Sequence, residues 1–173
     1  AGAPYALEDS RRFYYAPDIS EVRCGGRVFY NVAIGSGDRE KPVSDVSTRN
    51  SFFSFRDHLT RIPVDSADYK DDCSGVTDRP CFETIYDDSE LVDVTTTASP
   101  TVGPDKAGWK MDLVAVNASA SPPTISSRGE KALAESRTFA NNVYFTTYAP
   151  ELRKQGDCGN EVGVNRLYVV NAC

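Results

Sequence analysis

A chain of 173 residues is long enough for one ordinary domain and too short for two comfortable ones. The formal net charge of −6, with acidic and basic residues mixed along the chain, indicates a soluble surface and argues against a nucleic-acid-binding protein. No apolar run approaches the roughly 18 residues that a membrane-spanning helix needs. Nine Tyr and eight Phe, against one Met and one Trp, favour sheet over helix.

The amino-terminal half of the chain predicts three strands. Apolar residues at alternate positions indicate a strand over residues 28–34. Shorter apolar runs predict strands over 51–55 and 91–94, and the Pro- and Gly-containing residues 97–107 predict a loop. Residues 60–90 are rich in Asp and contain two cysteines, so we expect an acidic, disulfide-bearing surface insertion there.

The carboxyl-terminal half predicts three more strands. Alternation is strong over residues 109–116 and 143–148, and residues 166–170 form a last β-rich run. The Ser- and Pro-rich residues 117–127 predict a loop, whereas 130–136 have local helical propensity. Six or seven short strands without a long helix indicate an all-β protein. A sandwich and about two blades of a propeller are both compatible with this strand count.

The five cysteines predict disulfides rather than a metal site. Cys73 and Cys81 bracket a loop with strong turn signals, and Cys158 and Cys173 flank the last predicted strand. The sequence contains neither the Cys-x-x-Cys spacing nor the Cys/His cluster that zinc requires. We therefore predict Cys73–Cys81 and Cys158–Cys173 disulfides and an oxidising, extracytoplasmic location. Cys24 is left as a free buried thiol or as one whose partner lies outside this chain.

The sequence predicts no catalytic group. The Gly-Ser-Gly-Asp run at 35–38 lacks the third glycine and the following helix of a phosphate-binding loop, so we interpret it as a strand-ending turn whose glycines have positive φ. His58 is the only histidine. A triad of His58 with Ser51 or Ser54 and Asp57 is disfavoured, because strand neighbours point to opposite faces and no Gly-x-Ser-x-Gly elbow is present.

Six aspartates raise the question of a calcium site. Crowded carboxylates repel one another, and a divalent cation would relieve that repulsion. Their spacing does not match the Asp-x-Asp-x-Asp-Gly pattern, so we expect a solvated acidic loop and no cofactor, with calcium as the alternative. The residues concerned are Asp65, Asp68, Asp71, Asp72, Asp87 and Asp88.

Three aromatic residues present a second choice between binding and packing. Trp109, Tyr144 and Tyr148 can form a carbohydrate platform, but strand aromatics more often pack in a core, which is what we expect here. The Asn-Ala-Ser run that begins at Asn117 fits the glycosylation acceptor pattern.

Several segments, taken in order, resemble the C-terminal propeller region of the PilC/PilY family of type IV pilus proteins. The family's GSG-x-R-x-x-P turn, its GW-x-x-DL strand, its GEK run, its VYFTTY-x-P strand and its closing C-G…RLY strand all have similar counterparts. These segments are residues 11–18, 32–42, 49–57, 108–113, 128–131, 142–150, 158–159 and 165–171. They cover most of the chain, and their order is more specific than any single motif.

The resemblance implies a single region, 1–173, that forms a partial β-propeller of two or three blades. It implies a bacterial protein of the cell surface, pilus tip or outer membrane that acts by adhesion and pilus assembly and is not an enzyme. Expected partners are other pilus proteins, the remainder of the propeller, or a host or surface receptor, with no nucleic acid. The alternatives are a quinoprotein-like propeller dehydrogenase and a secreted β-sandwich adhesin.

A partial propeller should expose an apolar blade face to its partner. We expect that face to be lined by Trp109, Met111, Leu113, Val143 and Phe145.

Overall fold

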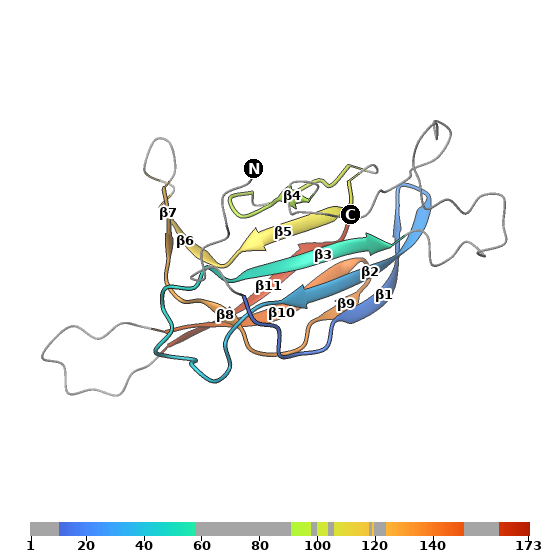
Figure 1. The fold of residues 1–173 in the computed structure, drawn as a ribbon. Coiled ribbons are helices and arrows are strands. Elements are labelled where there is room, and N and C mark those ends of the chain that lie inside the picture. The colour runs from blue at the N-terminus through green and yellow to red at the C-terminus, as the bar shows by residue number, and fades with distance from the viewer. Residues whose placement is uncertain are drawn as a thin grey trace, which may run out of the picture.

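The computed structural model describes residues 11–57, 91–97, 100–103, 106–117, 119, 124–150 and 163–173. These residues form eleven strands and no helix, which confirms the all-β prediction (Figure 1). In this described part of the chain, no helix is long and apolar enough to cross a membrane.

The first sheet has five strands in the order β1-β2-β3-β5-β4. Four of them form an antiparallel meander: β1 (Asp18–Cys24), β2 (Arg27–Gly35), β3 (Ser51–Asp57) and β5 (Gly108–Asp112). The short β4 (Val92–Asp93) pairs in parallel with β5 at the edge. The predicted strands at 28–34, 51–55 and 91–94 are confirmed here.

The second sheet is built around β10 (Asn142–Ala149). The edge strand β11 (Val164–Asn171) pairs antiparallel with β10 along its whole length. On the other side of β10, β8 (Lys131–Ala132) and β9 (Arg137–Phe139) pair antiparallel with its two ends. The helical propensity of residues 130–136 is overridden, because the backbone of this segment pairs with β10.

A small hairpin of β6 (Val114–Asn117) and β7 (Thr124–Ser127) stands apart from the two sheets. Two expectations are corrected here. The strand predicted over 109–116 is divided at Leu113, whose buried side chain and main-chain bond to Asn50 (N···O 2.9 Å) mark the end of the pairing with β3. The loop predicted over 117–127 contains β7, because main-chain pairing with β6 does not require an apolar sequence.

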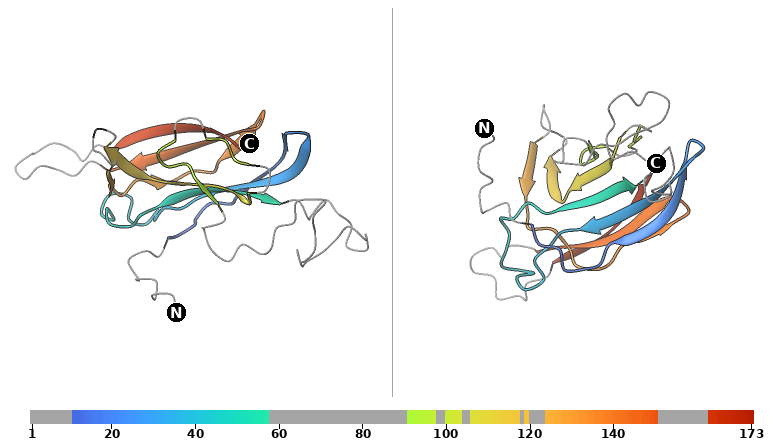
Figure 2. Two further views of the ribbon diagram at one scale, coloured as in Figure 1. Left: turned by 90° about the horizontal axis from the view of Figure 1, so that it is seen from above. Right: turned by 45° about the vertical axis from the view of Figure 1, so that its right-hand side comes forward.

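The two large sheets pack face to face, as the two layers in Figure 2 show. The rings of Phe52 and Phe145 stack between them, with centroids 3.7 Å apart, and Trp109 stacks beside Phe52. Within the described residues the sheets remain open, and no closed ring of blades is formed. We call the faces that meet the inner faces and the opposite ones the outer faces.

The predicted exposed blade face is therefore wrong. Trp109, Leu113, Val143 and Phe145 are at most 2% exposed, and Met111 packs against the same core. These residues point toward the space between the sheets, so the chain itself covers them.

The two sheets lie close together beside Gly35. A Cβ atom at this position would lie 2.8 Å from Cδ2 of Phe52 and still closer to Cβ of Ala132 in β8. Only glycine leaves room for β8 at this point.

One disulfide ties the two sheets together. Cys24, at the end of β1, is bonded to Cys173, two residues beyond β11, with the Cα atoms 5.4 Å apart. The predictions of an unpaired Cys24 and of a Cys158–Cys173 bond are both wrong. Spacing along the chain could not reveal this pairing, since the two cysteines are 149 residues apart and meet only because the sheets pack.

The other cysteine prediction, Cys73–Cys81, lies outside the described residues and stays a prediction. The same holds for Cys158, for His58, for the whole predicted insertion at 60–90 and for the six aspartates of the calcium hypothesis.

Candidate functional site

The strand β11 presents an open edge. Ala172 donates its backbone N–H to the carbonyl oxygen of Asn141 at 2.8 Å. Main-chain bonds of an antiparallel pair recur at every second residue, so residues 164, 166, 168 and 170 bond to β10. The N–H and C=O groups of residues 165, 167, 169 and 171 therefore point away from β10, and no described strand pairs with them.

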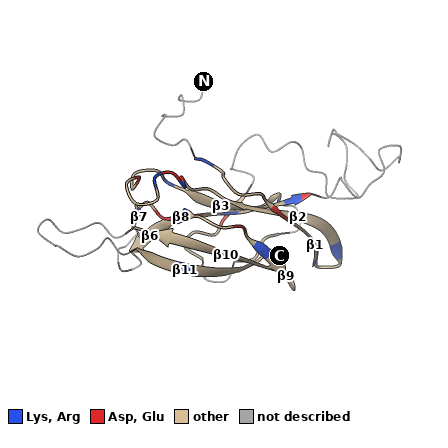
Figure 3. Cartoon of the chain, turned by 90° about the horizontal axis from the view of Figure 1, so that it is seen from below, with Lys and Arg blue, Asp and Glu red and all other residues tan. Residues whose placement is uncertain are grey.

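The outer face of the second sheet is apolar near this edge. Leu167 and Val169 are 65% and 53% exposed, and Phe139 on β9 is 74% exposed. Tyr144 lies opposite Val169 on the same face. In sequence, β10 has no charged residue and β11 has one, Arg166, so these strands are mostly tan in Figure 3. The combination of an open edge with exposed apolar side chains is typical of an interaction surface.

A groove of about 870 Å³ runs beside the carboxyl-terminal half of β11. Residues 168–171 line one side of it, and residues 94–97, residues 100–101 and Met111 line the other. Side chains from both faces of β11 border the groove, so the groove follows the edge of the strand. It therefore leaves space next to the main-chain groups that point away from β10.

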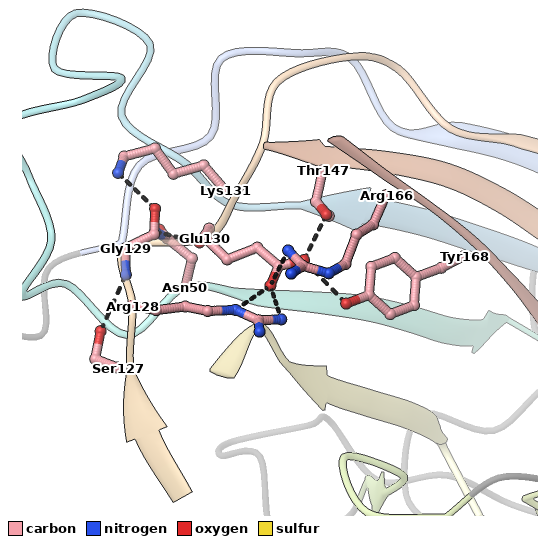
Figure 4. Close-up of polar contacts among 9 residues, drawn as sticks. All are labelled: Asn50, Ser127, Arg128, Gly129, Glu130, Lys131, Thr147, Arg166 and Tyr168. Carbon is pink, nitrogen blue, oxygen red and sulfur yellow. Dashed lines mark hydrogen bonds and ion pairs between the residues drawn. The ribbon is translucent and has the colours of Figure 1, made fainter. Parts of the chain in front are cut away.

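A buried carboxylate fixes the inner side of β11 (Figure 4). Glu130 is fully buried, and its Oε1 accepts hydrogen bonds from Thr147 Oγ1 at 2.5 Å and Tyr168 OH at 2.9 Å. Its Oε2 accepts from Nε of Arg128 at 2.7 Å, from a second nitrogen of the same guanidinium, and from Arg166 at 3.5 Å. Two arginines thus balance the charge, and hydrogen bonds from both strands satisfy the oxygens.

This network keeps Tyr168 protonated. Burial raises the pKa of Tyr168, and the charge of Glu130 and the hydrogen bond to it raise it further, to about 12. The phenol is therefore a hydrogen-bond donor at physiological pH. Because Arg166 and Tyr168 are held on the inner face, Leu167 and Val169 between and beside them must face outward.

Lys131, the first residue of β8, fixes the start of the second sheet. Its buried ammonium donates to the carbonyl oxygens of Gly129, at 2.7 Å, and Asp45. Burial lowers the pKa of Lys131, an effect that the charges of Asp45 and Asp38 partly offset. The lysine is occupied in holding the loop before β3 against β8, which is a structural role.

Arg56 holds the end of β11. Its guanidinium donates to the carbonyl oxygens of residues 102, 103, 172 and 173 at 2.7–3.3 Å and lies over the ring of Phe29. Burial lowers the pKa of Arg56. Together with the disulfide, these bonds fix one end of the groove.

The residues singled out from the sequence are dispersed in the structure. The run at 35–38 ends β2, and Asp38 accepts a hydrogen bond from the backbone of Glu40, as in a turn. The expected positive φ of its glycines is wrong, because Ser36 between them still donates its backbone N–H to Ser51 of β3. Ser51 and Ser54 are buried and donate to Asp112 and Asn31, respectively. No group of His, Cys, Asp and Glu among the described residues has the arrangement of a metal site.

The aromatic residues divide between the two faces. Trp109 is a core residue, as expected, whereas Tyr144 and Tyr148 lie half-buried on the outer face of the second sheet. Asn117 is exposed at the end of β6, and its side-chain oxygen accepts a hydrogen bond from the backbone of Ser119.

Sequence reasoning did not identify the Glu130 network or the Arg56 clamp. Glu130 stands in a charged run, Arg-Gly-Glu-Lys, that by itself resembles an exposed turn. Its partners Thr147 and Tyr168 lie 17 and 38 residues away, so only the pairing of β10 with β11 brings them together.

No protein-family model matches the chain, and comparisons with curated proteins and with solved structures also give no match. Function must therefore be argued from the site itself.

Proposed function

We propose that this chain belongs to a bacterial surface protein of the type IV pilus, where it acts by binding and assembly and not by covalent chemistry. We further propose that its two large sheets are neighbouring blades of a partial β-propeller. The ordered PilC/PilY-like motifs support the first statement. A β-hairpin that occurs in both sheets, but turns opposite faces toward the core, supports the second.

The hairpin occurs once in each large sheet. The turn between β1 and β2 has two residues with positive φ, Gly25 (57°) and Gly26 (83°). The turn between β9 and β10 also has two, Ala140 (48°) and Asn141 (62°). Two-residue turns of this kind match the twist of the strands that they join. In both sheets a third antiparallel strand, β3 or β11, then pairs with the second strand of the hairpin.

The two hairpins turn opposite faces toward the core. Counting from the turn, the third residue of β2, Phe29, is buried in the first sheet, whereas the second residue of β10, Val143, is buried in the second. Equivalent positions therefore face in opposite directions relative to the interface. Two repeats related by a two-fold axis would bury equivalent positions, but two repeats stacked in the same orientation, as propeller blades are, bury opposite ones.

The single observation that carries the propeller proposal is that both sheets have apolar residues on their outer faces. The first sheet has a second apolar cluster on its outer face, formed by Phe53 with Leu91 and Ala107, which the chain itself buries. The ring of Phe13, 49% exposed, lies beside Phe53 on this face. The second sheet exposes Phe139, Leu167 and Val169. A blade inside a ring needs apolar residues on both faces, because each face packs against a neighbour. The disulfide is compatible with an oxidising compartment.

The test is genetic replacement in the bacterium that encodes the chain. Deletion of the gene should reduce surface pili, and a Leu167→Asp/Val169→Asp variant should fail to restore them, although it is secreted in normal amounts. Glu135→Gln, at the exposed ion pair with Arg137, is the matched control and should restore them. Normal piliation of the deletion strain would refute the pilus function.

Face-to-face packing of two open sheets also favours a second candidate, a β-sandwich adhesin unrelated to pili. Electron microscopy of the natural assembly separates the two. Four-stranded sheets arranged radially around an axis would support the propeller, and an isolated two-layer domain would support the sandwich.

A further inference from the structure

The two repeats differ at one edge. In the first sheet β3 is covered by β5, whose backbone bonds to it at Arg56 and at Asn50 (both 2.8–2.9 Å). The equivalent strand of the second sheet is β11, and the described part of the chain supplies no strand on its far side. Among the described residues, the second sheet thus has no counterpart of the strand that completes the first.

We propose that the edge of β11 is a strand-addition site, at which an extended segment of a partner polypeptide pairs antiparallel with residues 165–171. This inference rests on the repeat of the proposed function and goes beyond it by naming the place and chemistry of attachment. The main-chain groups of residues 165, 167, 169 and 171 supply the hydrogen bonds, and the groove beside residues 168–171 receives side chains of the added strand.

The chemistry of the edge selects an extended peptide. The eight residues of β11 span about 26 Å and include no proline. Lys and Pro commonly protect exposed edges, yet the four residues with outward main-chain groups are Asn165, Leu167, Val169 and Asn171. The one charged residue of β11, Arg166, is paired with Glu130 on the inner face. The buried Glu130 network fixes the inner side of β11, and the Arg56 clamp fixes its carboxyl-terminal end, so the edge is preorganised for pairing.

The first sheet also predicts the register. In the first sheet Asp57 of β3 lies opposite Tyr30, the fourth residue of β2. In the second sheet Tyr168 of β11 lies opposite Phe145, the fourth residue of β10. The two pairs are therefore equivalent when the hairpin turns before β2 and β10 are aligned. Ser54 of β3, which lies opposite Trp109 of β5, then corresponds to Asn165. We therefore expect the added strand to place an aromatic side chain opposite Asn165 and to leave it on the outer face, near Leu167.

The probe is a labelled synthetic peptide with the sequence of residues 106–113, KAGWKMDL, which contains β5. In the first sheet the N–H groups of Ala107 and Trp109 face β3, because Ala107 bonds to that strand and bonded residues alternate. In the expected register these two residues lie opposite Leu167 and Asn165. N-methylation at Ala107 and Trp109 should weaken binding about tenfold or more by removing two main-chain bonds. N-methylation at Gly108 and Lys110, which face away, is the matched control.

Hydrogen exchange locates the site in the intact wild-type protein. The amides of Asn165 and Leu167 should exchange rapidly in the free protein and at least about tenfold more slowly with the peptide. Those of Arg166 and Tyr168 should be slow throughout, and that of Val169, which lies beyond the peptide in the expected register, should not change. Equal binding of both methylated peptides, or unchanged exchange at Asn165 and Leu167, would overturn the proposal. Edge-to-edge dimers that the peptide does not disrupt would also overturn it, in favour of a second copy. Neither failure would alter the piliation of the deletion strain, which tests the proposed function separately.

Discussion

Glu130 shows how one side chain can determine the conformation of an edge strand. A fully buried carboxylate is stable only when donors surround it, and here they come from β10, β11 and the segment before β8. The same bonds keep Arg166 and Tyr168 on the inner face of β11. The apolar side chains of the proposed attachment site are therefore oriented by a residue on the opposite side of the strand.

Replacement of Glu130 tests this role. In Glu130→Gln the two arginines lose their shared charge partner and one acceptor oxygen becomes a donor, so the free energy of unfolding should fall by about 2–4 kcal/mol. Urea unfolding followed by fluorescence measures the change. In the matched control Glu135→Gln, which alters an exposed ion pair, the change should stay within about 0.5 kcal/mol. Equal effects of the two substitutions would show that the Glu130 network contributes nothing specific.

Tyr168 makes stability depend on alkaline pH. Its pKa rises from 10.0 to about 12 on folding, so the folded protein retains the phenolic proton more strongly than the unfolded chain. The resulting contribution is complete below pH 10 and is lost as the pH rises through 12. Unfolding free energies of the wild type and Tyr168→Phe should therefore differ by a constant amount below pH 10 and converge above it. Parallel curves over the whole range would contradict the raised pKa.

At the scale of the elements, close contact between β2 and β8 joins the two sheets. Gly35 provides the room, since Ala132 occupies the space that a side chain at position 35 would need. The long strands β2, β3, β10 and β11 were predictable because alternation is a local property of the sequence. The strands β1, β7 and β9 were not, because their sequences are largely polar and their pairing partners define them.

Gly35→Ala should lower the free energy of unfolding by about 1–3 kcal/mol through overpacking. The double variant Gly35→Ala/Ala132→Gly should be more stable than the sum of the two single effects predicts, because removing one Cβ makes room for the other. Additive effects in a double-mutant cycle would show that the two positions do not contact each other.

At the scale of the whole molecule, the disulfide and the Arg56 clamp close one corner. Cys24–Cys173 connects residues 149 positions apart, so breaking it releases most of the chain from a constraint in the unfolded state. Cys24→Ser/Cys173→Ser should lower the stability by about 2–5 kcal/mol, measured by urea unfolding. A variant as stable as the wild type would mean that Arg56 alone secures the corner.

Peptide mapping without reduction gives an independent check. It should recover residues 24 and 173 in one linked peptide, and a link between Cys158 and Cys173 would contradict the structure. The same map tests the remaining prediction, because a Cys73–Cys81 link should appear in a separate peptide.

Local sequence patterns were enough to predict the all-β class, the spans of the long strands and the turn after β2. Each of these depends on residues close together in the chain, whose side-chain period and backbone preferences act locally. Packing of the two sheets, which no local pattern reveals, covers Trp109 and Phe145, leaves Leu167 and Val169 exposed, and brings Cys24 to Cys173. These outcomes depend on which face of one sheet meets the other, and segments more than a hundred residues apart make that contact.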